Sequence, residues 1–124
     1  MSKRTQIAIA GNPNVGKTSL FNALSGLNQK VGNWPGVTVE KKEGFYEYNN
    51  QSFHLIDLPG IYNLHSLSLD EKVSEQFLLT ENPDLILYVA DSTKLSRSLF
   101  LAVEILEMGF PFILCLNKRS GELG

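Results

Sequence analysis

The chain has 124 residues, of which 43% are hydrophobic and 19% charged, as is ordinary for one soluble globular domain. Its formal net charge of −2 excludes the global positive field that draws proteins to nucleic acid. The single cysteine, Cys115, excludes an internal disulfide, and no apolar run approaches the ~20 residues that span a bilayer. With no secretory signal visible at the start, we expect a soluble cytoplasmic domain that binds no nucleic acid and inserts into no membrane.

A strand, a glycine-containing loop and a helix are predicted first. The strand covers Thr5–Ala10, which is rich in β-formers and alternates. The helix covers Lys17–Ser25, where apolar residues recur at helical spacing, and ends at Gly26. The pattern G-x-x-x-x-G-K-[ST] lies between them and is matched at every fixed position. This phosphate-binding loop consists of Gly11, Asn12, Pro13, Asn14, Val15, Gly16, Lys17 and Thr18, and Ser19 follows it.

The residue types in this loop suit a polyphosphate. Glycine lets the main chain turn its N–H groups inward and come close to the ligand. The helix that starts at the end of the loop directs its free N–H groups and its positive dipole end at the anion. Lys17 then supplies a charge for the β and γ phosphates, and the Thr18 hydroxyl can ligate Mg²⁺.

A polar loop and a β-hairpin are predicted next. Leu27–Thr38 is expected to be irregular, and a long loop beside a phosphate site is often functional. Glu40–Tyr48 and Ser52–Leu58 are predicted strands joined by a turn at Asn49-Asn50, because asparagine tolerates positive φ. His54 is expected at the surface or half-buried, since no cysteine or second histidine lies at metal-ligand spacing.

Helices and strands alternate in the second half. Ile61–Leu69 is expected to be irregular, and a helix opens at Asp70 and Glu71, whose charges suit its dipole. This helix ends at Asn82-Pro83. The apolar run Leu85–Ala90 predicts a strand that is buried on both faces.

A last helix and strand complete the prediction. The helix covers Leu95–Met108 and stops at Gly109. Phe112–Leu116 is predicted to be another buried strand, in which Cys115 fills the core and is no nucleophile. The helix is expected to present one apolar face made of Leu99, Val103 and Leu106. Together these elements predict an α/β fold with a mostly parallel sheet and one antiparallel hairpin strand.

Three further positions suit a nucleoside triphosphate with Mg²⁺. Asp57 ends a predicted strand, where a carboxylate can hold a metal-bound water. Gly60 can offer its N–H to the γ phosphate because no side chain blocks the approach. Thr38 can add a second hydroxyl to the metal. The loops that carry these residues would be ordered by the γ phosphate and released after hydrolysis.

These successive motifs resemble those of a GTPase of the translation-factor-related class. The runs Val31–Glu40 and Asp57–Tyr62 narrow the resemblance to the N-terminal G domain of the bacterial ferrous-iron transporter FeoB, over about Gln6 to Asn117. The resemblance implies a P-loop NTPase fold of the Ras-like kind, with GTP/GDP and Mg²⁺ bound. Beyond the phosphate-binding loop, the nucleotide contacts that it implies are Gly36, Val37, Thr38, Asp57, Leu58, Pro59, Gly60, Asn117 and Lys118.

The resemblance also implies a role and partners. It implies slow GTP hydrolysis as a switch in ferrous-iron uptake, at the cytoplasmic face of the bacterial inner membrane. The implied partners are a helical regulatory part and a membrane permease part. No residue cluster in this sequence suggests an iron path, so iron enters through the resemblance alone.

For hydrolysis, the resemblance implies roles for Lys17, Thr38, Gly60 and Asn14. The family asparagine that matches Asn14 helps to bind a K⁺ ion that stimulates hydrolysis, with carbonyls from around Gly32–Trp34. Many small GTPases place a water-orienting glutamine directly after the Asp57–Gly60 motif. Here that position is Ile61, whose side chain cannot hold water, so slow turnover is expected.

Some positions leave two interpretations open. The pair Asp70-Glu71 either holds the second loop in place or supplies charges at a helix N-terminus. Trp34 either anchors the first loop through apolar contacts or is an exposed partner contact. His65 is expected to be solvated.

The last stretch departs from the family pattern. Family members read guanine with a strand that ends in Asn-Lys-x-Asp or Asn-Met-x-Asp, but Ser120 stands at the aspartate position here. The loss of charged hydrogen bonds should cost roughly 1.5–3 kcal/mol each, which lowers guanine selectivity. Arg119–Gly124 fits no helix or strand pattern, so we expect residues 1–124 to form a partial G domain. Its strand Phe112–Leu116 would then lie at an uncovered sheet edge that is prone to association.

Two other functions are weighed against this one. A ribosome- or tRNA-associated GTPase shares the phosphate-binding loop sequence, but it would need a basic surface, which the net charge of −2 disfavours. A non-catalytic remnant of the domain is favoured by Ser120 and by the missing later elements. The sequence leaves open whether this chain hydrolyses GTP.

Overall fold

The computed structural model describes residues 4–64 and 68–117. Its strands are β1 (Thr5–Gly11), β2 (Gln29–Asn33), β3 (Glu40–Tyr48), β4 (Gln51–Asp57), β5 (Leu85–Asp91) and β6 (Phe112–Asn117). Its helices are α1 (Lys17–Ser25), α2 (Leu69–Glu81) and α3 (Leu95–Leu106), and a 3-10 turn, η1 (Ser92–Lys94), leads into α3.

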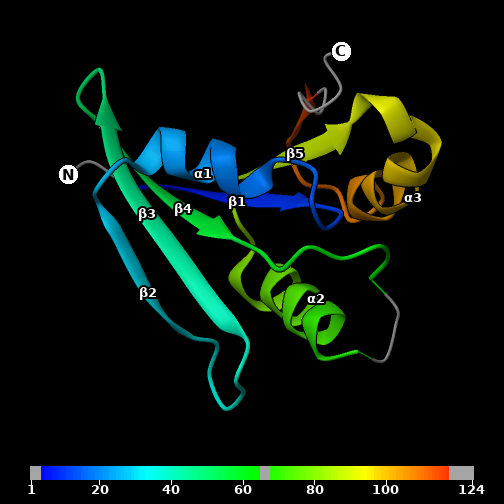
Figure 1. Ribbon diagram of the computed structural model, residues 1–124. Coiled ribbons are helices and arrows are strands. Elements are labelled where there is room, and N and C mark those ends of the chain that lie inside the picture. Colours follow the sequence, from blue (N-terminus) through cyan, green and yellow to red (C-terminus); the bar gives the residue numbers. More distant parts are fainter. Residues whose placement is uncertain (1–3, 65–67, 118–124) are drawn as a thin grey trace.

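These strands form one sheet in the order β2-β3-β4-β1-β5-β6 (Figure 1). The four strands β4, β1, β5 and β6 run parallel, and β2, β3 and β4 pair antiparallel. This confirms the predicted α/β fold with a mostly parallel sheet and an antiparallel hairpin. Because Ile9 pairs with Asp57, the chain leaves β1 and β4 at the same edge of the sheet. Ligands of open α/β sheets bind at that edge, outside the carboxyl ends of the strands.

The sheet is covered on both faces, and α1 and α2 lie on opposite sides of it (Figure 1). Alternate residues of β1 point to the two sides. Ile7 and Ile9 pack with Phe21 of α1 in one buried cluster. Ala8 and Ala10 belong to the other cluster, which contains the buried side chains of α2 and α3. The two apolar layers hold the ends of β1 and β4 in a fixed position.

Several predicted boundaries are confirmed. The helix α1 covers the predicted Lys17–Ser25 and ends at Gly26, and β3 covers the predicted Glu40–Tyr48. Asn49 and Asn50, with φ of 52° and 62°, form the hairpin turn. The helix α2 opens one residue before the predicted Asp70, and its N-cap is Ser68.

The prediction that Leu27–Thr38 is irregular is wrong for Gln29–Asn33. These residues form β2, which pairs antiparallel with β3 at one edge of the sheet. All five side chains are exposed, so the strand has no alternation of buried and exposed residues for a sequence pattern to reveal. Pairing with β3 alone makes it a strand.

The predicted apolar face of the last helix is also wrong. Val103 and Leu106 are 50% and 49% exposed, and Leu99 is only partly buried. The buried face of α3 instead consists of Ser98, Leu101, Ala102 and Ile105. The small side chains at 98 and 102 let the helix approach β5, where the Tyr88 hydroxyl donates a hydrogen bond to the Ser98 carbonyl at 2.5 Å.

The strand β6 lies at the other edge of the sheet, as predicted, but it is not buried on both faces. Ile113, Leu114 and Leu116 are among the exposed large apolar side chains. Cys115 is partly buried and packs against the α1 cluster, and burial raises the pKa of its thiol. A raised pKa disfavours the reactive thiolate, which agrees with a packing role for this residue.

Candidate nucleotide site

The phosphate-binding loop turns sharply between β1 and α1. Gly16, the residue before the helix, has φ +94°, a left-handed conformation that side chains rarely adopt. A Cβ at this position would also lie 2.1 Å from Nδ2 of Asn117. Val15 is buried against α1, while Asn14 is exposed with φ 61°. The loop therefore exposes Asn14 and keeps only glycine where the chain turns into the helix.

Asn117 braces this loop from the end of β6. Its side-chain Nδ2 donates to the carbonyl oxygen of Val15 at 2.8 Å, across 102 positions of sequence. The first residue of the predicted guanine-reading motif thus lies beside the phosphate-binding loop. Lys118 and Ser120, the other residues of that motif, lie outside the described residues.

Lys17 and Asp57 meet at the centre of the site. The Lys17 Nζ lies 2.6 Å from Asp57 Oδ1 and donates to the Leu58 carbonyl at 2.8 Å. Lys17 is 8% exposed and Asp57 9%. Removal of either partner would leave a buried charge uncompensated, which is strongly destabilising. The charges predicted to serve the phosphates and the metal are therefore adjacent and paired with each other.

The segment after β4 rests directly on the phosphate-binding loop. The Ile61 N–H donates to the Gly11 carbonyl at 3.0 Å, and Nδ2 of Asn12 donates to the Ile61 carbonyl at 2.8 Å. A Cβ on Gly60 would lie 2.8 Å from Cα of Pro13, so only glycine allows this contact. Ile61 is 4% exposed and packs in the core with α2 and α3. The Ile61 side chain packs in the core and is almost fully shielded from the solvent.

Oxygen donors for a divalent cation are present at the same edge. Thr18 and Ser19 follow Lys17 in the first turn of α1 and are exposed. Hydroxyl and carboxylate oxygens are the ligands that Mg²⁺ prefers. The Thr18 hydroxyl and the Asp57 carboxylate are therefore oxygen donors that suit Mg²⁺. In this structure one carboxylate oxygen of Asp57 is paired with the Lys17 ammonium.

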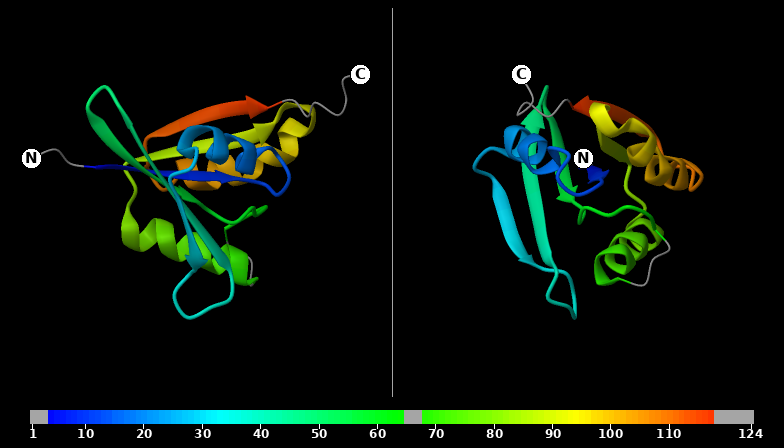
Figure 2. Two further views of the ribbon diagram at one scale, coloured as in Figure 1. Left: turned by 60° about the vertical axis from the view of Figure 1, so that its left-hand side comes forward. Right: turned by 45° about the vertical axis from the view of Figure 1, so that its right-hand side comes forward.

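The segment that carries Thr38 lies away from this centre. It is exposed in the segment between β2 and β3, whose tip lies away from the phosphate-binding loop in every view (Figures 1 and 2). Gly36 is exposed in the same segment with φ 76°, and Val37 packs against the core. The structure thus brings the motifs Gly11–Thr18 and Asp57–Gly60 together, while the segment that carries Thr38 lies apart from them.

Trp34 anchors that segment. It is 6% exposed, and its ring meets Phe77 of α2 edge to face with centroids 5.5 Å apart. The Lys41 ammonium lies 4.8 Å from the ring centroid. The main-chain N–H of Trp34 donates to the Val39 carbonyl at 2.9 Å and closes the segment into a loop. Of the two interpretations of Trp34, the structure supports the apolar anchor.

The remaining candidates have structural roles. His54 is half-buried, lies 2.8 Å from Glu43 Oε1 and stacks on Phe45. Asp70 is exposed in the first turn of α2, while Glu71 is buried. His65 lies outside the described residues. Within residues 4–64 and 68–117, no group of three histidine, cysteine or acidic side chains could hold a metal ion.

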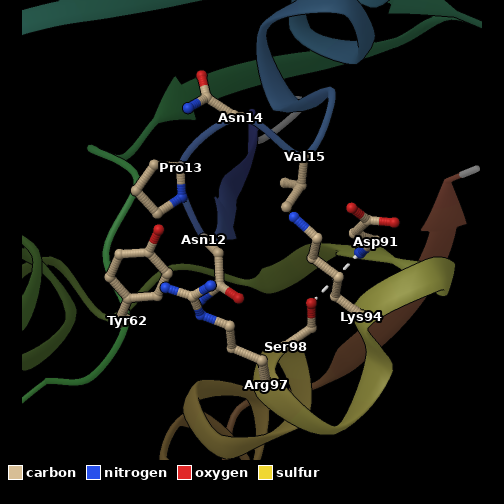
Figure 3. A pocket seen from close by; sticks show the side chains of 9 residues that line it. All are labelled: Asn12, Pro13, Asn14, Val15, Tyr62, Asp91, Lys94, Arg97 and Ser98. Atoms are coloured by element: carbon tan, nitrogen blue, oxygen red, sulfur yellow. Dashed lines mark hydrogen bonds between the residues drawn. The ribbon is translucent and has the colours of Figure 1, made fainter. Parts of the chain in front are cut away.

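One group of polar side chains near the loop was missed by sequence reasoning. Lys94, the last residue of η1, and Arg97 in the first turn of α3 extend toward the phosphate-binding loop (Figure 3). In the sequence, a lysine and an arginine three residues apart look like ordinary solvent-exposed residues. Their place beside the phosphate-binding loop becomes visible only in the folded structure, where η1 and α3 lie next to that loop.

Comparison with known proteins identifies the family. The family model described as Ferrous iron transport protein B matches residues 5–121. The chain belongs to the FeoB family. The Fe(2+) transporter FeoB of Methanocaldococcus jannaschii is 51% identical over 86% of this chain and 16% of its own length. Relatives from Shigella flexneri and other bacteria are 45% identical over 93% of this chain and 15% of theirs.

Solved FeoB structures share the fold. The G domain of T. maritima FeoB superposes with a TM-score of 0.89 and 54% identity over 92% of this chain and 72% of that one. The cytosolic domain of the same transporter has been solved in GDP and GMPPNP forms, with TM-scores of 0.87 and 0.86. Those two share 54% and 55% identity, over 92% and 89% of this FeoB chain and 45% and 44% of theirs.

This FeoB-family chain spans about one sixth of the length of the curated relatives that it matches. None of the helices in the described part of the chain is long and apolar enough to cross a membrane. The match to the T. maritima G domain covers 72% of that G-domain chain.

Proposed function

We propose that this domain binds guanine nucleotide and hydrolyses GTP slowly, as the switch of a ferrous-iron uptake system. The observation that carries the proposal is the buried contact between Lys17 and Asp57. Lys17 is the first residue of α1, directly after the glycine at the end of the phosphate-binding loop. The GDP and GMPPNP forms of T. maritima FeoB support a guanine nucleotide as the ligand.

Binding exchanges one partner of Lys17 for another. The main-chain N–H groups at the start of α1 and its dipole attract the phosphates. The Lys17 ammonium then contacts phosphate oxygens, and its contact with Asp57 loosens. The Asp57 carboxylate would then be available to help hold Mg²⁺ through a water molecule. The 2.6 Å pair keeps both charges compensated while no nucleotide is bound.

Two cations are part of the proposal. A bound Mg²⁺ would neutralise the phosphate charge, with the Thr18 hydroxyl and Asp57, through water, as its donors. Asn14 is exposed on the loop and offers an amide oxygen for K⁺. Added positive charge at this position would compensate for the absence of a water-orienting side chain at Ile61.

Hydrolysis is proposed to be slow because Ile61 occupies the position directly after Gly60, where many small GTPases have a water-orienting glutamine. Gly60 lies against Pro13 and can present its N–H to the γ phosphate. Ile61 is fixed in the core by packing and by the Gly11 carbonyl. The Ile61 side chain has no polar group that could orient water, so the rate depends on electrostatic stabilisation.

Thr38 is proposed to reach the nucleotide after the loop between β2 and β3 changes conformation. Trp34 holds this loop on α2, but its indole Nε1 is buried with no hydrogen-bond partner among the described residues. A buried donor without a partner costs about 1–3 kcal/mol of stability, so this cost lowers the stability of the conformation in which Trp34 packs on α2. The γ phosphate can then compete for the loop, and its loss lets the anchor re-form.

The cellular role is carried over from the family. The helical regulatory part and the membrane permease part of the transporter are proposed as the partners that respond to the nucleotide state. The domain is proposed to act at the cytoplasmic face of the bacterial inner membrane. Iron itself is the cargo of the transporter and has no proposed site in this domain.

Phosphate release from GTP, measured in K⁺ and in Na⁺, tests the proposal. The parent is expected to turn over slowly and faster in K⁺. Asn14→Ala should lose the K⁺ stimulation, and Lys17→Ala should lose nucleotide binding altogether. Lys30→Ala, on the exposed strand β2, is the matched control and should behave as the parent. Equal parent rates in K⁺ and Na⁺ would remove Asn14 from the mechanism, and full activity of Lys17→Ala would refute the proposed site.

A further inference from the structure

A pocket lies between the phosphate-binding loop and the start of α3 (Figure 3). Its volume is about 230 Å³, and residues 12–15 of the loop form one wall. Lys94, Arg97 and Ser98 line it from the α3 side, and Tyr62 lines it from the segment after β4. At about 30 Å³ per water molecule, the space holds a small ion together with several waters.

The lining carries excess positive charge. Lys94 and Arg97 form no ion pair with a carboxylate within residues 4–64 and 68–117. Asp91 also lines the pocket, and its Oδ1 accepts hydrogen bonds from the N–H and the hydroxyl of Thr93. Two cations thus face one carboxylate that already caps the turn before α3.

The two cations are held in different ways. The Arg97 guanidinium lies 4.5 Å from the centroid of the Tyr62 ring, which orients its planar donor fork. Lys94 extends toward Val15 and Arg97 toward Asn12 and Tyr62 (Figure 3). Charged donors therefore enter the space from two directions, and the Tyr62 and Ser98 hydroxyl groups add polar donors.

We propose that this pocket is a binding site for a phosphate-sized oxyanion, held by Lys94 and Arg97 against residues 12–15. Oxygens of a tetrahedral anion point in several directions and match donors that converge from two sides, whereas a carboxylate presents its oxygens in one plane. A small apolar ligand does not fit, because its burial would desolvate two charged groups. The site is separate from the Lys17 contact and uses none of its residues.

The anion could come from either of two sources, and in both cases it is inorganic phosphate. It is either inorganic phosphate from solution or the phosphate released by hydrolysis next to the pocket. The second source depends on the proposed function, and the first does not. Because Tyr62 belongs to the segment that carries Gly60, the occupied pocket fixes that segment against α3.

Calorimetric titration with inorganic phosphate, on the chain saturated with GDP, tests the site. Arg97→Gln and Lys94→Gln should each weaken phosphate binding roughly tenfold or more, because each removes a charge-assisted hydrogen bond. Lys30→Gln, which removes one charge on exposed β2, should leave the affinity unchanged. Equal affinity in the parent and the Arg97→Gln/Lys94→Gln double variant, or an equal loss in Lys30→Gln, would overturn the proposal.

Two further arms separate this site from the proposed function. Phosphate should still bind to the Lys17→Ala/Asp57→Ala double variant, which removes both charges of the buried pair and leaves neither uncompensated. This binding should depend on Arg97, whether or not a nucleotide binds. In single turnover, Arg97→Gln should alter the release of phosphate but not its formation if the product fills the pocket. An unchanged release rate assigns the site to phosphate from solution. Absence of saturable phosphate binding to both the parent and the Lys17→Ala/Asp57→Ala double variant would refute the site itself.

Discussion

At the scale of single residues, the contact between Lys17 and Asp57 is the centre of the account. The motif identified both residues, because their roles depend on residue type and position. Their mutual contact depends on the parallel pairing of β1 and β4, which places Asp57 opposite Ile9. A sequence pattern names the groups that meet a ligand, but it does not say which partners they hold without one.

The contact between Gly16 and Asn117 leads to a prediction on stability. Gly16→Ala should destabilise the fold by roughly 1–3 kcal/mol, because it places a side chain in a left-handed conformation and against the Asn117 amide. Urea unfolding measures the change. Asn117→Ala removes the obstructing amide, so the double variant should be less destabilised than the sum of the two single variants. Simple additivity would show that the amide and the loop are not in contact.

At the scale of elements, the predicted strands and helices are right wherever a local signal defines their ends. Gly26 ends α1, and Asn49 and Asn50 turn the hairpin with positive φ. The strand β2 was missed because its five residues are all exposed and only β3 defines it. The face of α3 was misassigned because the small residues Ser98 and Ala102 share the buried face with Leu101 and Ile105, whereas Val103 and Leu106 are exposed.

The loop between β2 and β3 has a built-in reporter, because Trp34 is the single tryptophan of the chain. Its emission should shift to longer wavelength when GMPPNP with Mg²⁺ draws the loop from α2 and exposes the ring. GDP should leave the emission unchanged, since it lacks the γ phosphate. Phe77→Leu, which weakens the edge-to-face contact, should shift the emission without nucleotide. Identical spectra in the GDP and GMPPNP states would contradict the proposed movement of Thr38.

The apolar edge strand leads to another prediction. Ile113 and Leu114 are exposed on opposite faces of β6, which forms one edge of the sheet. Uncovered apolar edges favour association between chains. Sedimentation velocity should therefore show concentration-dependent association of the parent, and Ile113→Glu should reduce it. The exposed Val31→Glu on β2, at the opposite edge, is the control variant. A parent that stays monomeric at all concentrations would refute the expectation.

At the scale of the whole molecule, the order of the strands explains why distant motifs form one site. The strands β4, β1 and β5 lie side by side and parallel, so Asp57, Gly11 and the start of α3 all reach one edge. The α/β class follows from the alternation of helices and strands in the sequence. The pocket with Lys94 and Arg97 does not, because it exists only once α3 packs beside the loop.

The family assignment and the site also agree at this scale. The match to FeoB covers residues 5–121. Of the motifs that suggested the family, the sheet brings Gly11–Thr18 and Asp57–Tyr62 together, while the run Val31–Glu40 lies apart. Lys118 and Ser120, which we expect to lie beside the nucleotide base, are outside the described part of the chain.

Calorimetric titration of this chain with GDP and with ADP tests the central claim most directly. We predict saturable GDP binding that is lost in Lys17→Ala, and a narrow margin over ADP because Ser120 cannot replace the base-reading aspartate. Ser120→Asp should widen that margin. Failure of both nucleotides to bind the folded parent, or equal binding to the parent and Lys17→Ala, would contradict a polyphosphate site at Gly11–Thr18.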